Sequence, residues 1–101
     1  MTAATTTFRV DRYVVDVLLR DLVGHDRSAA AFIVFLFLWR RTIGENAREA
    51  RMSHREIAEE VGLSKSAVQH ALRILHPRGF VRSRSARPTD TPAHAVLRPW
   101  A

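Results

Sequence analysis

The sequence predicts one α+β domain that is mainly α-helical, with three to four helices and a small β-hairpin. Three observations predict this class. Apolar residues recur at three- and four-residue steps in several segments, serines stand where helices are expected to begin, and two short extended segments flank a polar, proline-bearing stretch near the end of the sequence. With 101 residues the chain can build one modest hydrophobic core.

The composition limits the kinds of site and partner. The chain has no cysteine, which excludes disulfides and thiolate metal sites, and its first residues, MTAATTTF, lack the basic start and apolar run of a signal peptide. The net charge is +6, and from residue 64 onward seven Lys and Arg residues accompany a single acid, Asp90. Such a one-sided basic region favours a polyanion, most often nucleic acid. The alternative is a chain that simply uses arginine throughout.

The first helix is expected within residues 10–26, VDRYVVDVLLRDLVGHD. Apolar residues recur in this segment at helical spacing with charged residues between them, and Gly24 is expected to end the helix. Residues 1–9 are expected to form a flexible segment ahead of a single domain at residues 10–101.

A second helix is expected from about Ser28 to Ile43, with Asp26 or Ser28 capping its start and Gly44 ending it. It contains nine consecutive apolar residues, AFIVFLFLW. This run is shorter than the roughly 20 residues of a membrane span and is apolar all round, unlike a helix that lies on a membrane surface, so no membrane partner is expected. Most of these side chains should pack in the core, and the surplus should contact a second subunit. The residues predicted at this subunit contact are Phe32, Phe35 and Trp39.

Two further helices are expected to be short and joined by a glycine-containing turn. Ser53 and Glu56 fit a capping box, in which each residue satisfies a backbone N–H of the other. Gly62 can adopt the left-handed conformation that reverses the chain, and Ser64 can cap a helix that runs to His76. Residues 53–76 therefore form a predicted helix-turn-helix. Its second helix presents an outward strip of polar and basic side chains, and an α-helix fits the major groove of DNA.

A small sheet is expected to follow. Gly79 permits a sharp exit from the preceding helix, and residues 80–84 and about 93–98 have the pattern of strands. The polar, proline-bearing stretch 85–92 would join them as a hairpin with a mobile tip. A further short strand is expected around Arg51.

The pattern Ile57-Ala58, Val61-Gly62-Leu63-Ser64 and Ala67-Val68, followed by ALRILHPRGFVRSRS, resembles winged helix-turn-helix DNA-binding domains. The stretch WRRTIGENAREARMSHREIAEEVGLSKSAVQHAL is similar to the amino-terminal domains of bacterial and phage replication proteins and to small bacterial regulators. The resemblance implies that residues 80–98 form the wing, that the second helix enters the major groove, and that the wing lies on the DNA backbone. The DNA-binding residues that it implies are Ser64, Lys65, Ser66, Gln69, His70 and Arg73 on the helix and Arg82, Arg84 and Arg87 on the wing.

These features predict a sequence-specific double-stranded DNA-binding protein, namely a cytoplasmic, nucleoid-associated transcriptional regulator of bacterial or phage type that acts as a homodimer. Two alternatives stay open: a replication or plasmid-maintenance protein that binds origins, and a winged-helix module that binds only protein. No histidine is expected to have a carboxylate or second histidine at the four-residue step of a helix face, and no catalytic triad or phosphate loop is present. No metal, cofactor or enzymatic activity is therefore expected. A small-molecule effector is not expected either, because no separate ligand-binding domain fits in this length.

Overall fold

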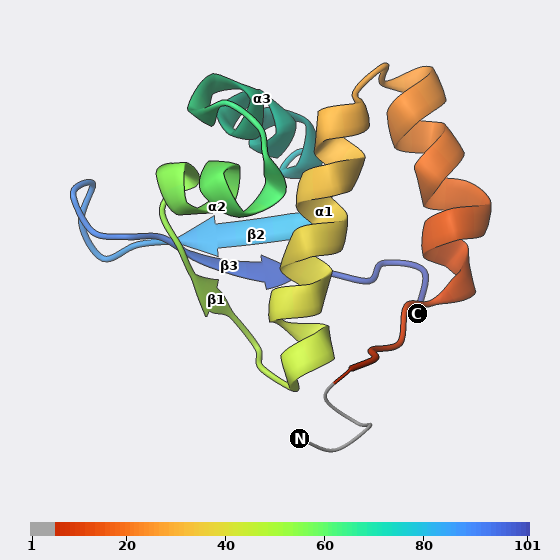
Figure 1. Cartoon of the computed structure of the whole chain (residues 1–101), viewed down its shortest axis with the longest axis horizontal. Coiled ribbons are helices and arrows are strands. Elements are labelled where there is room, and N and C mark those ends of the chain that lie inside the picture. The colour runs from red at the N-terminus through yellow and green to blue at the C-terminus, as the bar shows by residue number, and fades with distance from the viewer. Residues whose placement is uncertain (1–5) are drawn as a thin grey trace.

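The structure, a computed structural model, describes residues 6–101 and combines helices with a small antiparallel sheet (Figure 1). A first helix at residues 12–25 precedes three α-helices and three strands. Their bounds in chain order are α1 Ala29–Arg41, β1 Ala50–Arg51, α2 His54–Val61, α3 Lys65–Leu75, β2 Val81–Arg84 and β3 Ala93–Val96. The predicted α+β class is confirmed.

The predicted first helix is present, and two of its segments, Val14–Leu18 and Asp21–His25, are π-helical. A π-helix has hydrogen bonds from residue i+5 back to residue i. The backbone N–H of Asp26 accordingly donates to the Asp21 carbonyl at 3.0 Å, and this bond spans Gly24. The prediction that Gly24 ends the helix is therefore wrong. The chain instead turns at Arg27, whose φ is 54°.

The helix α1 begins and ends through hydroxyl groups. The Ser28 Oγ accepts a hydrogen bond from a first-turn backbone N–H at 3.0 Å, so Ser28, and not Asp26, is the capping residue. At the other end Thr42 leaves the helix, and its hydroxyl donates to the Leu38 carbonyl at 2.7 Å. The helix therefore ends at Arg41, before the predicted Gly44. The structure has no helix, within residues 6–101, that is long and apolar enough to cross a membrane.

The core lies around α1, which runs between the first helix on one side and α2, α3 and the sheet on the other (Figure 1). Phe35 and Trp39 are 0% and 1% exposed, and their rings belong to an aromatic cluster that includes Phe80 and Trp100. The prediction that Phe35 and Trp39 lie at a subunit contact is therefore wrong, because neighbouring elements of the same chain cover them. Phe32 is half-buried.

The helix-turn-helix has the predicted caps. The Ser53 Oγ accepts from the Glu56 backbone N–H at 3.0 Å, and a Glu56 carboxylate oxygen accepts from the Ser53 N–H at 2.8 Å. Gly62 follows α2 with a left-handed φ of 78°, which turns the chain towards α3. The Ser64 Oγ then accepts from the Ala67 N–H at 3.1 Å and starts α3. The capping serines and Gly62 therefore define the ends of α2, the turn and the start of α3 through contacts between residues that are close in sequence.

The sheet has the strand order β1-β3-β2, and both pairings are antiparallel. The strand around Arg51 is confirmed, and it converts the predicted hairpin into a three-stranded sheet in which Arg51 pairs with Ala93. In the β2–β3 pairing Ser83 lies opposite His94, and Arg82 lies opposite Ala95. Because strand side chains alternate between faces, Ser83 and His94 share one face of the sheet while Arg82 and Ala95 share the other.

Candidate nucleic-acid interface

The helix α3 presents a polar and basic strip away from the core. Lys65, Ser66, His70 and Arg73 are exposed, and Gln69 is half-buried. The opposite side of the helix is apolar and packs in the core through Val68, Ala71, Leu72 and Leu75. Neither Lys65 nor Arg73 forms an ion pair in the described part of the chain, so both charges are available to a ligand.

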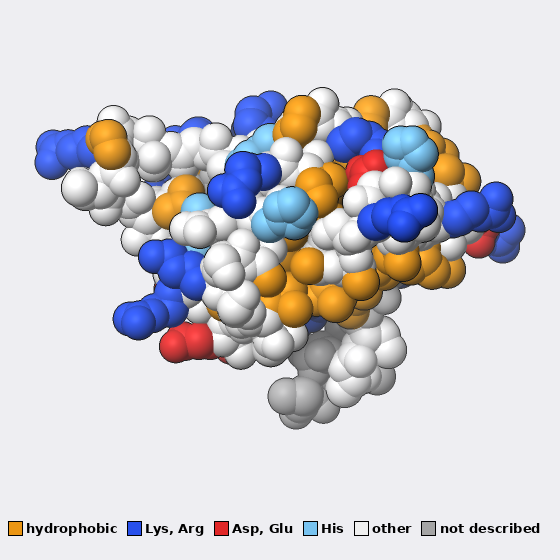
Figure 2. All heavy atoms as spheres, turned by 90° about the horizontal axis from the view of Figure 1, so that it is seen from above, with side chains coloured by type: hydrophobic (Ala, Val, Ile, Leu, Met, Phe, Trp, Pro, Cys, Tyr) orange, Lys and Arg blue, Asp and Glu red, His pale blue; other side chains and the backbone are white. Residues whose placement is uncertain are grey.

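A groove of about 510 Å³ lies between α3, the start of α2 and the wing loop; we call it the α3–wing groove. Lys65 and Gln69 line its α3 side, and residues 88–92 line its wing side. Figure 2, which looks down on the molecule from above, shows Lys and Arg side chains from the protruding loop at the left across the upper surface, with few acidic side chains between them. A helix and a loop placed in this way can contact one groove of a duplex and the adjacent backbone.

Arg55 and His54 also line the α3–wing groove, although neither was predicted as a site residue. Arg55 is exposed in the first turn of α2. The capping box at Ser53 locates this turn in the sequence. Only the fold, however, shows that the start of α2 lies beside Lys65 and the wing loop.

The predicted wing residues separate into two groups. Arg87 is exposed in the loop between β2 and β3, as a backbone contact would require. Arg82 and Arg84 instead belong to the face of the sheet opposite Ser83, whose hydroxyl is hydrogen-bonded to His76 at the end of α3. Arg84 is also held by Glu49 through two hydrogen bonds of 2.7 Å. The predicted DNA-binding residues Arg82 and Arg84 therefore lie on the face of the sheet opposite the one that contacts α3.

A chain of hydrogen bonds joins the end of α3 to both long strands and to the segment before α2. His76 Nε2 lies 2.8 Å from the Ser83 Oγ, which lies 2.7 Å from His94 Nδ1. His94 Nε2 lies 2.9 Å from the Met52 carbonyl oxygen. Because a carbonyl only accepts, His94 donates from Nε2. In a neutral His94 the Nδ1 atom then accepts from the Ser83 hydroxyl, whose oxygen in turn accepts from His76.

This direction requires His94 to be neutral. His94 is fully buried, and burial lowers its pKa, whereas its hydrogen bond to Met52 partly opposes this effect. Burial also lowers the pKa of His76 and His54, and positive charge on either residue would lower the pKa of His94 further. The neutral chain therefore ties the C-terminal end of α3 rigidly to the wing.

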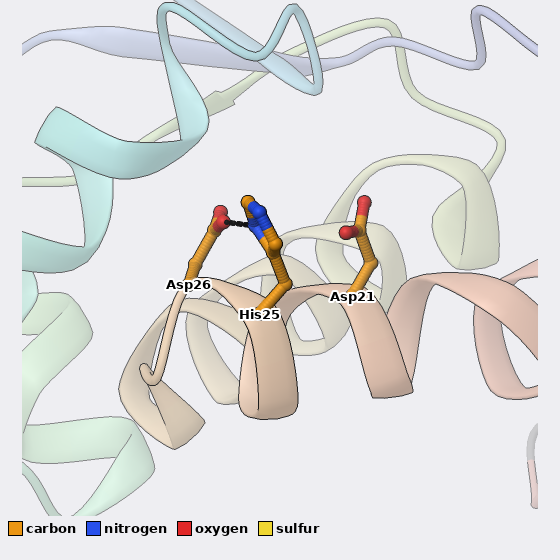
Figure 3. A group of neighbouring side chains, drawn as sticks. All are labelled: Asp21, His25 and Asp26. Atoms are coloured by element: carbon orange, nitrogen blue, oxygen red, sulfur yellow. Dashed lines mark hydrogen bonds and ion pairs between the residues drawn. The ribbon is translucent and has the colours of Figure 1, made fainter.

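Asp21, His25 and Asp26 form a cluster at the end of the first helix (Figure 3). Asp21 precedes His25 by four residues, so the expectation that no histidine has a carboxylate at this step is wrong. His25 Nδ1 lies 2.8 Å from an Asp26 oxygen. The guanidinium of Arg78 donates to the other Asp26 oxygen at 2.6 Å and also to Asp21. Arg78 therefore pairs with both carboxylates and ties the first helix to the turn after α3.

Comparison with known protein families agrees with this geometry. Residues 47–82 match the model of a family described as winged helix-turn-helix DNA-binding, and the matched segment contains β1, α2, α3 and the start of β2. No curated protein matches the chain. The resemblance to winged helix-turn-helix domains is confirmed for residues 47–82, the segment that contains the basic strip of α3.

Proposed function

We propose that this protein is a sequence-specific double-stranded DNA-binding protein of bacterial or phage type that acts in the cytoplasm, at the nucleoid, as a homodimeric transcriptional regulator. The proposal rests mainly on the exposed strip of α3, where Lys65 and Arg73 have no acidic partner in residues 6–101 and lie in a segment of a DNA-binding family.

The residue types on α3 suit the major groove. Lys65 and Arg73 can donate to guanine or phosphate oxygens, and Gln69 can bind an adenine edge through its amide. Arg55 lines the α3–wing groove and Arg87 is exposed in the wing loop, and both suit phosphate contacts. Phosphate contacts would supply most of the affinity and base contacts most of the discrimination between sequences.

The homodimer is supported by an exposed apolar band on the first helix and α1. Val15, Leu19 and Val23 recur every four residues and are 55%, 36% and 39% exposed, and Ile33 of α1 is 39% exposed. Figure 2 shows hydrophobic side chains gathered in a band over these two helices. Contiguous exposed apolar surface of this kind marks contact sites, and a twofold dimer is the commonest arrangement that covers it.

A dimer would also lengthen the DNA sequence that the protein can read. One recognition helix reads only a few base pairs, whereas a twofold pair reads two half-sites about 34–36 Å apart or a multiple of that distance. We therefore expect a palindromic target. Selection of sites from random duplexes with the purified protein tests this expectation, and direct repeats in place of a palindrome would favour the origin-binding alternative.

The double variant Lys65→Ala/Arg73→Ala tests the DNA-binding face. Wild-type protein should bind duplex DNA at low salt, and the affinity should fall steeply as salt increases. The variant should lose most of this affinity, and the slope of log K against log salt should decrease by up to about 2, because two phosphate-contacting cations are removed. Fluorescence anisotropy with labelled duplexes measures both quantities.

The matched control is Arg12→Ala/Arg20→Ala, which removes the same charge from exposed positions on the first helix. This control should keep its affinity within about twofold of wild type, because it alters only the long-range field. If wild-type protein has no affinity for DNA even at low salt, the proposal fails and a protein-binding module is favoured.

A further inference from the structure

The sheet has a second groove on the face that carries Arg82 and Arg84. It has a volume of about 480 Å³ and lies between this face and the segment that joins α1 to β1. We call it the sheet groove and define it by Ile43, Arg48, Glu49, Arg82, Arg84 and Ala95. Its volume lies within the range of about 300–1,000 Å³ that is usual for ligand-binding clefts.

The walls of the sheet groove are cationic. Three arginines and one glutamate leave a net charge of +2. The hydrogen bonds from Arg84 hold the pKa of Glu49 below its usual value, so Glu49 is ionised and neutralises Arg84. Arg48 and Arg82 are exposed and have no ion pair within the described residues, so their charge is free to attract an anion.

The floor of the sheet groove is apolar. Ala95 of the central strand is only 6% exposed, and its small side chain leaves room between the arginines of β2 and the segment before β1. Ile43 and Leu97 extend this floor and are half-buried. A groove with cationic walls and an apolar floor fits an extended chain that alternates carboxylates with apolar side chains, since successive side chains of such a chain point in opposite directions.

The groove also lies apart from the DNA-binding face. In Figure 1, α3 lies above the strands of the sheet, and the segment between α1 and β1 lies below them. A duplex on α3 would therefore leave the sheet groove open. A single-stranded nucleic acid is less suited to it, because such ligands stack on aromatic side chains and none of the described residues that line this groove is aromatic.

We propose that the sheet groove binds an acidic peptide segment of a second protein while α3 is bound to DNA. Arg48 and Arg82 would attract the carboxylates of the peptide, and the apolar floor would contact the apolar side chains between them. The protein would then connect a DNA site to a protein partner through two opposite faces of one domain.

The test uses the whole chain and a fluorescein-labelled ten-residue peptide of alternating Glu and Leu, with a Gln-Leu peptide as the neutral control. At low salt the Glu-Leu peptide should bind and the Gln-Leu peptide should not. The double variant Arg48→Ala/Arg82→Ala should weaken peptide binding by about tenfold, because two exposed charge contacts are lost. Its affinity for duplex DNA should stay within about threefold of wild type. In free energy this change is less than half of the change expected for the peptide.

The variant Lys65→Ala/Arg73→Ala is the reciprocal control, because it should lose DNA affinity and keep peptide affinity. Saturating duplex DNA should leave peptide binding unchanged. The proposal is overturned if the wild-type protein does not bind the Glu-Leu peptide, if DNA displaces the peptide, or if Arg48→Ala/Arg82→Ala leaves peptide binding intact. It is also overturned if Arg48→Ala/Arg82→Ala reduces DNA affinity as strongly as Lys65→Ala/Arg73→Ala, since the groove would then be a DNA contact.

Discussion

Gly62 has a φ of 78°, a conformation that costs most other residues about 1–2 kcal/mol through repulsion between the Cβ atom and the backbone. Among the described residues other than Gly62 and its two chain neighbours, no heavy atom lies within 4 Å of a Cβ placed on Gly62, so local backbone strain is the main cost of a substitution. Gly24 differs because it lies inside the π-helical segment, where the nearest atom to an added Cβ is Arg20 Cγ at 3.9 Å. The two glycines look equivalent in the sequence, yet only Gly62 is required by its conformation.

Alanine substitutions at these glycines should therefore have opposite effects. Gly62→Ala should lower the free energy of unfolding by about 1–2 kcal/mol. Gly24→Ala should raise it by about 0.5–1 kcal/mol, because alanine loses less backbone entropy in a helix. Urea unfolding followed by circular dichroism measures both changes. A loss of stability in Gly24→Ala would contradict the helical role assigned to this residue.

The buried histidines predict a dependence of stability on pH. Burial lowers the pKa of His94 and His76 below the ordinary value of 6.5, so the unfolded chain binds protons at a higher pH than the folded chain. The stabilisation is fully present above pH 6.5 and declines as the pH falls towards the folded-state pKa values. The slope is about 1.4 kcal/mol per pH unit for each additional proton that the unfolded state binds.

Urea unfolding between pH 7.5 and pH 5 measures this decline. The variant His94→Gln should be less stable at pH 7.5, and its stability should depend less on pH because one titrating group has been removed. His70→Gln is the control, since it removes an exposed histidine of α3 that takes no part in the hydrogen-bonded chain. A wild-type stability that stays constant over this range would contradict the neutral hydrogen-bonded chain.

Among the elements, the first helix is joined to the turn after α3 by the side chain of one arginine. Arg78, in the turn after α3, pairs with Asp21 and Asp26, and its guanidinium lies 5.2 Å from the centroid of the Phe80 ring. The Asp26 side chain is only 14% exposed, so removal of Arg78 would leave a largely desolvated carboxylate with only His25 beside it. The attachment of the first helix to the turn after α3 therefore depends on this side chain.

Arg78→Ala should lower the free energy of unfolding by about 1–3 kcal/mol, the usual cost of leaving a desolvated hydrogen-bonding group without its partner. Amide hydrogen exchange should also become faster in residues 12–25. Arg98→Ala is the matched control, because Arg98 pairs with Asp11 at 3.1 Å in a more exposed position and should cost about 0–1 kcal/mol. Equal losses in the two variants would contradict a special role for Arg78.

The elements also show why some predictions from sequence succeeded. Ser53, Glu56 and Gly62 act on their immediate neighbours along the chain, so their pattern alone predicted α2 and the turn after it. The end of α1 depended on Thr42, whose hydroxyl bonds back to the helix in place of the expected glycine. No short sequence pattern of this kind predicts the π-helical segments of the first helix.

The candidate site was predictable on α3 and not on the wing. The helical period alone separates the outward Lys65 and Arg73 from the buried side of α3. Strand alternation likewise groups Arg82 with Arg84, but the face that they occupy depends on which residues of β3 lie opposite them. The hydrogen bonds of His94 could not be predicted from sequence for the same reason, because its partners Ser83 and Met52 come from other parts of the chain.

For the whole molecule, the exposed band on the first helix predicts the oligomeric state. Val15→Glu/Leu19→Glu should convert a dimer into a folded monomer, because it places charge in the proposed contact and leaves the buried face of the helix unchanged. Light scattering coupled to size-exclusion chromatography measures the mass. Affinity for a palindromic site should fall by at least about tenfold, since the two half-sites are no longer bound by linked subunits.

The control for this experiment is Val17→Glu on the same helix. Val17 is 43% exposed but shares its side of the helix with Tyr13 and Asp21, which face Trp100 and Arg78 of the same chain. Val17→Glu should remain a dimer. A wild-type protein that is monomeric at micromolar concentration, or equal dissociation in both variants, would show that the band is not a subunit contact.

The aromatic cluster at the base of the first helix gives the protein a built-in optical probe. Trp39 and Trp100 are its only two tryptophans, and their rings stack at 6.4 Å with planes 8° apart, while Tyr13 stacks on Trp100 at 4.6 Å. All tryptophan emission therefore comes from one junction between the first helix, α1 and the end of the chain. A change in this emission reports movement of the first helix, and DNA bound to α3 must be followed with a label of its own.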